Sequence, residues 1–180
     1  VQHSAIWISN TAGSNYLISG NTIGYSSSSG TGTYDLYGGV SFSFNAISLE
    51  VSNITESNIQ NNIIRNITVS AGTAPFNGIF VPNGRVNITG NSFGDQTGTG
   101  SLNFDAPNGD VIMIHATGNG SINCSNNNFG GVTLNLSPSA YHNFYGILAT
   151  MFGSATFTCE NNIIGGTAGN SINALSTHAN

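Results

Sequence analysis

The sequence has almost no basic side chains. Its 180 residues include no lysine, and the two arginines are Arg65 and Arg85. Seven acidic residues bring the formal net charge to -5, and charged residues make up only 5% of the chain. Nucleic acids and anionic membrane surfaces are bound through basic tracks that replace their counterions. We therefore expect neither as a partner.

Long apolar runs and a recognisable leader are also missing. No run of about 18 apolar residues occurs, so we predict no membrane-spanning helix and no membrane insertion. The first residues, Val1-Gln2-His3, lack the basic and apolar regions of a signal peptide. The composition, free of lysine and rich in Asn, Thr and Gly, nevertheless favours an extracellular or cell-surface protein.

The sequence does contain a repeated seven-residue pattern. It consists of Ile or Cys, any residue, Gly or Asn, a fixed Asn, any residue, Ile or Phe, and usually Gly. Such self-similarity is typical of a solenoid, in which each repeat packs on its neighbours, so we predict one all-β domain over residues 1–180. The fixed asparagines are Asn21, Asn62, Asn91, Asn127 and Asn162, spaced by 41, 29, 36 and 35 residues.

A second landmark supports the repeat. An apolar strand begins twelve residues before the pattern in four copies, at Ile6, Ile47, Ile112 and Ile147, and nine residues before it at Ile79. Gly and Asn tolerate a left-handed backbone, so each copy is expected to read strand, bend, strand. We expect the first pattern positions to stack as an inward-facing core column: Ile18, Ile59, Ile88, Cys124 and Cys159.

The two cysteines, Cys124 and Cys159, occupy the same slot in adjacent copies. Isoleucine fills this slot elsewhere, which favours small buried side chains. A disulfide is the alternative, because neighbouring strands lie only ~4.8 Å apart. Directly stacked parallel side chains fit the disulfide torsion poorly, however, so we predict free thiols.

The Asn-centred repeat resembles the right-handed parallel β-helices of the pectate-lyase-like superfamily. Within that group it is most similar to the asparagine-ladder repeats of large secreted bacterial surface proteins, over roughly residues 5–175. The resemblance implies a right-handed parallel β-helix, and the repeat copies predict about five coils with an incomplete sixth. The five asparagines would then stack at the strand spacing and bond through their amides, as a scaffold rather than as a ligand site.

Catalytic chemistry finds little support in the sequence. Hydrolases and lyases on such folds need clustered carboxylates, with or without a basic residue, and the acidic residues here are spread thinly. The best local candidate is a calcium site at Asp105 and Asp110, but a polar turn explains these residues better. The histidines lack zinc-site spacing, so we expect no metal, no cofactor and no enzyme activity.

Aromatic residues gather in the longest insertions of the first and fourth copies. If exposed, the tyrosines would form a platform on which sugars could stack, whereas phenylalanines are more often buried beneath a loop. The residues concerned are Tyr34, Tyr37, Tyr141 and Tyr145, with Phe42, Phe44 and Phe144.

No polar cap is evident at either end of the repeat array. Ile6, Trp7 and Ile8 begin the first strand at once, and the segment from Ile172 to Leu175 is interpreted as the start of an unfinished sixth coil. Open solenoid ends can stack head to tail into a filament. We expect the first residues of a second copy to complete this sixth coil.

These observations predict a non-enzymatic structural module of an extracellular bacterial fibre, filament or adhesin. Its partners would be other copies of itself or adjoining β-helix segments. A carbohydrate-active or carbohydrate-binding β-helix, with glycans as partners, is the main alternative, because one fold hosts many functions. A trimeric β-helix similar to those of phage tails is a third possibility.

Overall fold

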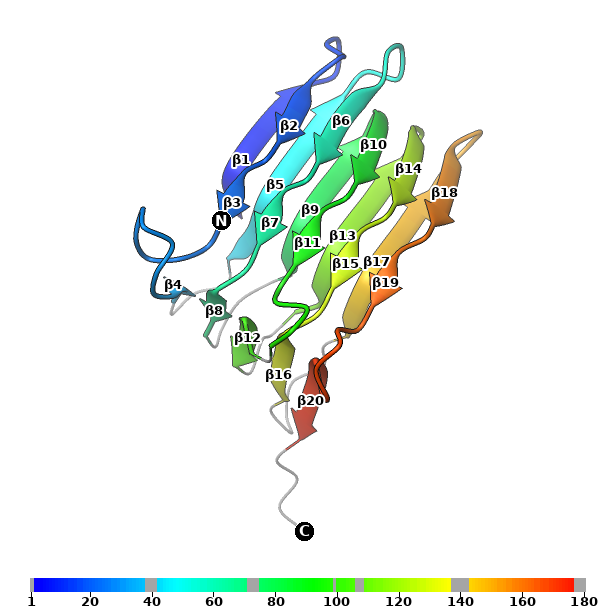
Figure 1. The fold of residues 1–180 in the computed structure, drawn as a ribbon. Helices are drawn as coiled ribbons and strands as arrows, with labels where there is room; N and C mark the ends of the chain where they lie inside the picture. The colour runs from blue at the N-terminus through cyan, green and yellow to red at the C-terminus, as the bar shows by residue number, and fades with distance from the viewer. Residues whose placement is uncertain are drawn as a thin grey trace.

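A computed structural model describes residues 2–37, 42–70, 75–98, 100–105, 109–136 and 143–176. All regular structure among these residues is β-strand, and the chain winds through five coils of four strands each (Figure 1). Each coil adds one strand to each of four sheets. The predicted parallel β-helix solenoid is therefore confirmed.

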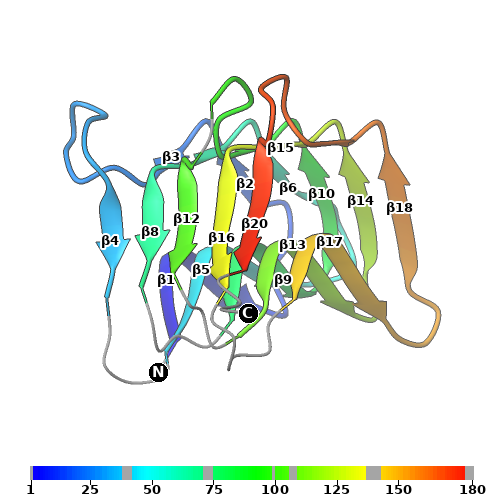
Figure 2. The same cartoon turned by 90° about the horizontal axis from the view of Figure 1, so that it is seen from below.

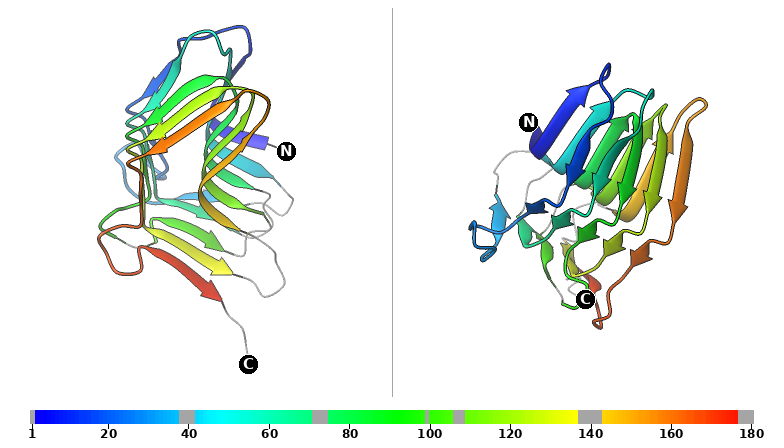
Figure 3. Two further views of the ribbon diagram at one scale, coloured as in Figure 1. Left: turned by 90° about the vertical axis from the view of Figure 1, so that its right-hand side faces the viewer. Right: turned by 45° about the horizontal axis from the view of Figure 1, so that its top comes forward.

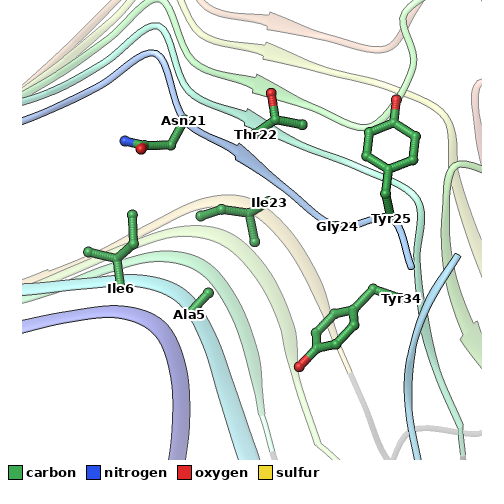
Figure 4. Close-up of a pocket in the computed structure, with 8 residues that line it drawn as sticks. All are labelled: Ala5, Ile6, Asn21, Thr22, Ile23, Gly24, Tyr25 and Tyr34. Carbon is green, nitrogen blue, oxygen red and sulfur yellow. The ribbon is translucent and has the colours of Figure 1, made fainter. Parts of the chain in front are cut away.

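The first sheet contains the longest strands, and all of its neighbouring pairs are parallel. The strand β1 bends at Ala5, so that Ala5 and Ile6 both point into the solenoid (Figure 4). The strands of this sheet are β1 (Gln2–Asn10), β5 (Ser43–Val51), β9 (Phe76–Asn83), β13 (Val111–Gly118) and β17 (Phe144–Met151).

The second sheet follows a turn and carries the predicted core column. Ile18, Ile59, Ile88, Cys124 and Cys159 pair in consecutive registers, and the first four of them are buried. Its strands are β2 (Leu17–Ser19), β6 (Ser57–Gln60), β10 (Arg85–Thr89), β14 (Ser121–Ser125) and β18 (Thr156–Glu160).

Two further sheets of short strands close each coil, as the view onto the fifth coil shows (Figure 3, left). The third sheet contains β3 (Thr22–Ile23), β7 (Ile63–Ile64), β11 (Ser92–Phe93), β15 (Asn128–Phe129) and β19 (Ile163–Ile164). The fourth contains β4 (Tyr34–Leu36), β8 (Ile67–Val69), β12 (Leu102–Asp105), β16 (Val132–Leu136) and β20 (Ile172–Ser176).

The bend between the second and third sheets has the predicted backbone in every coil. The residue before each fixed asparagine has a φ between 55° and 68°. This left-handed conformation is tolerated by glycine and asparagine, which explains why only these two residue types occupy the position. They are Gly20, Asn61, Gly90, Asn126 and Asn161.

The incomplete sixth coil predicted from Ile172–Leu175 is wrong. Strand β20 pairs with β16 in the fourth sheet, so it completes the fifth coil instead of opening another (Figure 2). The apolar alternation of Ile172 and Ala174 continues that of Val132 and Leu134, the strand one coil earlier. From its sequence alone, this short apolar segment could be either the first strand of a sixth coil or the last strand of the fifth. Only its pairing with β16 shows which sheet it belongs to.

The landmark isoleucine of the fourth copy also needs correction. Ile114, not Ile112, pairs with Ile79 on one side and Ile147 on the other. The connection from β13 to β14 consists of residues 119–120, whereas residues 152–155 connect β17 to β18. The separation of twelve residues is therefore not kept in this coil, since its turn is shorter.

One apolar core runs the length of the solenoid. In the third sheet the column Ile23, Ile64, Phe93, Phe129 and Ile164 lies in register, and the rings of Phe93 and Phe129 stack with centroids 4.9 Å apart. The inner members are fully buried, but Ile164 in the last coil is 59% exposed. No described residue covers the core beyond the fifth coil.

Candidate functional site

The fixed asparagines form a continuous hydrogen-bonded column at the bend. In every step the backbone N–H and the side-chain Nδ2 of one asparagine both donate to Oδ1 of the asparagine in the next coil, at 2.9 to 3.0 Å. We call this column the asparagine ladder: Asn21, Asn62, Asn91, Asn127 and Asn162.

A second set of bonds runs along the ladder in the opposite direction. From the second coil onward, Nδ2 also donates to the backbone carbonyl of the core-column residue one coil earlier, at 2.9 to 3.0 Å. Buried polar groups are costly unless they are paired, and these bonds satisfy the corner of each coil. The carbonyls belong to Ile18, Ile59, Ile88 and Cys124.

The ladder has a direction, and its two ends differ. Asn21 donates through its N–H and Nδ2 to Asn62, but no donor among the described residues reaches its own Oδ1. Asn162 accepts two bonds from Asn127, but its N–H has no acceptor within the same part of the chain. The first coil therefore presents an acceptor and the fifth coil a donor. We refer to these open faces as the acceptor end and the donor end.

The acceptor end contains a hollow of about 390 Å³ (Figure 4). The side chains of Ile6 and Ile23 point into it from opposite walls, and Tyr34 forms its far side. Asn21 lies at its rim, so an apolar floor is combined with one amide. The lining residues are Ala5, Ile6, Asn21, Thr22, Ile23, Gly24, Tyr25 and Tyr34.

The donor end exposes side chains that are buried in every inner coil. Ile164 continues the fully buried pair Phe93 and Phe129, and Cys159 continues the buried Cys124, but both are exposed in the last coil. Phe157 and Ile172 pack only partly against the core. The face thus combines projecting apolar groups with the unpaired N–H of the ladder.

The two cysteines are free thiols in different surroundings. Burial raises the pKa of the Cys124 thiol to about 12, and the neighbouring Cys159 contributes in the same direction. Because the thiolate is the reactive form, we expect native protein at pH 8, at concentrations where the chain is monomeric, to alkylate one thiol per chain, and urea-unfolded protein two. Mass spectrometry of iodoacetamide-treated protein measures this. The control Cys159→Ser should leave no reactive native thiol, and equal labelling of both thiols would contradict the burial of Cys124.

The residues predicted for end stacking are only partly brought together. Ile6 lines the hollow of the acceptor end, and Ile8 packs partly against the core. Trp7 points elsewhere: it is 69% exposed and borders a separate surface hollow with Gln2 and Ser4. At the other end, Ile172 is half-buried and Leu175 is exposed.

The calcium candidate at Asp105 and Asp110 gains no third acidic or histidine ligand among the described residues. The Asp105 carboxylate accepts from Asn135 Nδ2, and Asp110 Oδ1 accepts from the N–H and Nδ2 of Asn143 at 2.9 Å each. Within the described ranges no three His, Cys, Asp or Glu side chains gather closely enough to hold a metal ion. Both carboxylates instead bond to asparagines of the following coil.

Of the four tyrosines expected to form a sugar-stacking platform, only the two of the first coil are exposed among the described residues. Tyr37 is 85% exposed and Tyr34 is 41% exposed, whereas Tyr145 is half-buried and Tyr141 lies outside the described residues. Phe42 and Phe44 are buried, as expected for phenylalanine, and Phe144 packs partly against the core.

Sequence reasoning missed a row of side chains on the first sheet. Trp7, Ser48, Phe80 and His115 occupy one register row, and the Phe80 and His115 rings lie 5.0 Å apart. His115 Nδ1 also lies 3.2 Å from Asn77 Oδ1, and burial lowers the pKa of His115 against the opposing effect of Asp110. A sequence signal for this row does exist, because each of its residues directly follows the landmark isoleucine of its coil. In the fourth coil that signal could be read only after the register had identified Ile114 as the landmark.

Comparisons with protein-family models, with curated proteins and with solved structures gave no match for this chain. No helix within the described residues is long and apolar enough to cross a membrane. The parallel β-helix, its asparagine ladder and its two dissimilar ends are therefore the features from which a function must be inferred.

Proposed function

We propose that this chain is a structural module that assembles end to end, coil upon coil, into a fibre, filament or adhesin of a bacterial surface. The observation that carries the proposal is the state of the two ends. All four sheets end at the same two coils, so each end presents four strand edges without partners among the described residues. Such edges pair readily with another chain.

The apolar surface of the donor end supports association. Ile164 is 59% exposed, and Cys159, which continues the inward-facing core column, is also exposed in the last coil. Covering a large aliphatic side chain is worth roughly 1.5–3 kcal/mol, before the entropy lost on association is subtracted. Several such groups on one face, together with four strand edges, supply a driving force for stacking.

Electrostatics do not oppose stacking. The strands of the first coil contain one carboxylate, Asp35, and those of the fifth contain one, Glu160. Continuing the observed registers places Asp35 opposite Asn173, and Glu160 opposite Ser19. The two negative charges would therefore not meet. The nearly uncharged walls and the extracellular type of composition fit building material exposed outside the cell.

Light scattering over a dilution series tests the proposal. We expect the mean mass to rise from the 18.5 kDa monomer as concentration increases, because stacking of two different ends does not close. Electron microscopy of the concentrated sample should show unbranched filaments with the width of a single solenoid. A monomer at every concentration would rule the assembly out.

A carbohydrate-binding role is the second candidate, and the row containing Trp7 and Phe80 is the observation that favours it. Exposed aromatic faces stack on sugar rings, Trp7 is 69% exposed, and the half-buried His115 supplies a polar group in the same row. Trp7 is the only tryptophan in the chain, so its fluorescence reports directly on this row. Titration with neutral and acidic oligosaccharides should shift the emission, whereas an unchanged spectrum would count against this role.

A further inference from the structure

We infer that the asparagine ladder fixes the direction of stacking, so that the donor end of one copy docks on the acceptor end of a second copy. The inference rests on the proposed end-to-end assembly and specifies its interface. Every step inside the molecule joins donors of one coil to an acceptor of the next coil. A second copy can continue this pattern in one orientation only.

The bonds expected at the junction follow from the internal steps. Asn162 of one copy would donate through its N–H and Nδ2 to Oδ1 of Asn21 in the second copy, as Asn127 does to Asn162. In return, Asn21 Nδ2 would donate to the Cys159 carbonyl, as Asn162 Nδ2 does to the Cys124 carbonyl. All three bonds found at each inner step would thus recur, and both orphaned ladder groups would be satisfied.

The opposite orientations fail by the same rule. Two donor ends face to face would bring no ladder Oδ1 to the N–H of Asn162, and two acceptor ends would bring no ladder donor to Oδ1 of Asn21. Polar groups buried without partners cost about as much as a lost hydrogen bond or more. A symmetric dimer would therefore leave the ladder unsatisfied at its centre, whereas the head-to-tail contact continues it.

The shapes of the two ends agree with this orientation. Continuing the column of the third sheet places the exposed Ile164 over Ile23, which lines the hollow of about 390 Å³. Continuing the fourth sheet places Ile172 over Tyr34, on the far side of that hollow. The side chain of Ile164 would thus enter the hollow of the second copy. The complete fifth coil of one copy would stack on the first coil of the next, and no second copy would be needed to complete a sixth coil.

Two single variants, each blocking one end, provide the test. Tyr34→Arg blocks the acceptor end, and Ile164→Arg blocks the donor end. Both side chains are substantially exposed, at 41% and 59%, so each variant should fold, which circular dichroism verifies. We expect each variant alone to be monomeric in analytical ultracentrifugation. The equimolar mixture should form a dimer of twice the 18.5 kDa chain mass, because each partner retains the end that the other needs.

A third substitution tests the ladder itself. Asn21→Leu, placed in the Ile164→Arg background, removes the acceptor while the hollow keeps its aliphatic walls. It should weaken the mixed dimer about tenfold or more, since two hydrogen bonds to Asn162 are lost. The matched control Asn53→Leu makes the same change at an exposed residue of the turn between β5 and β6, in the second coil and outside the hollow. It should leave the dissociation constant within about twofold, as expected for a surface substitution.

The results separate this inference from the proposed function. If either variant dimerises alone through its intact end, stacking is symmetric: the ladder direction is overturned while end-to-end assembly stands. An unchanged dissociation constant for Asn21→Leu would likewise overturn the role of the ladder alone. If the wild-type chain and the mixture both remain monomeric, the proposed assembly fails, and the inference fails with it.

Discussion

Replacing Phe93 with alanine is expected to lower the free energy of unfolding by about 3–5 kcal/mol. Phe93 is fully buried in the middle coil, and its ring stacks on Phe129 at an interplanar angle of 11°. The backbone at Gly78 closes against the same ring, because a Cβ built there would lie 2.6 Å from it. The ladder and the sheets fix the spacing of the coils, so the resulting cavity cannot collapse easily.

The matched control for Phe93 lies in the same column. Ile164→Ala truncates the exposed terminal member and should cost about 1 kcal/mol or less in the monomer, since little buried area is lost. Urea denaturation followed by circular dichroism, at concentrations where the chain is monomeric, measures both variants. Equal losses from the two substitutions would mean that the core is not a stack whose inner layers carry the stability.

Replacing Asn91 with leucine is expected to cost about 3 kcal/mol or more, although the two side chains are similar in size. Asn91 is fully buried, and its Oδ1 is the acceptor for both the N–H and Nδ2 of Asn62. Its own Nδ2 supplies the donor to the Ile59 carbonyl. Each buried group left without a partner costs about 1–3 kcal/mol, and this substitution leaves several.

Asn21→Leu serves as the comparison for Asn91, because it removes the same residue type from the end of the ladder. No described residue donates to Asn21 Oδ1, and Asn21 is partly exposed. We expect a loss of about 1 kcal/mol, since water can satisfy the groups that remain. The midpoint of urea unfolding distinguishes the two variants. Should the inner substitution be no more costly than the outer one, the ladder would not be a principal source of stability.

Much of this fold could be predicted from the sequence, because a parallel in-register stack places the same repeat position at the same place in every coil. The core column from Ile18 to Cys159 and the asparagine column were both recognisable as recurring residue types. The bend was recognisable too, since only Gly and Asn precede the ladder asparagine and all five adopt a positive φ. These features depend on local backbone preference and periodic burial.

The tertiary structure alone decided what depends on pairing between coils. It assigned Ile172–Ser176 to the fifth coil, moved the register landmark to Ile114, and placed Trp7 in one row with Phe80 and His115. These registers could not be predicted by counting residues back from the repeated pattern, because the turns that connect the strands differ in length from coil to coil. The direction of the ladder is likewise invisible in five identical asparagines. It arises from which amide faces which oxygen, and this in turn makes the two ends of the solenoid chemically different.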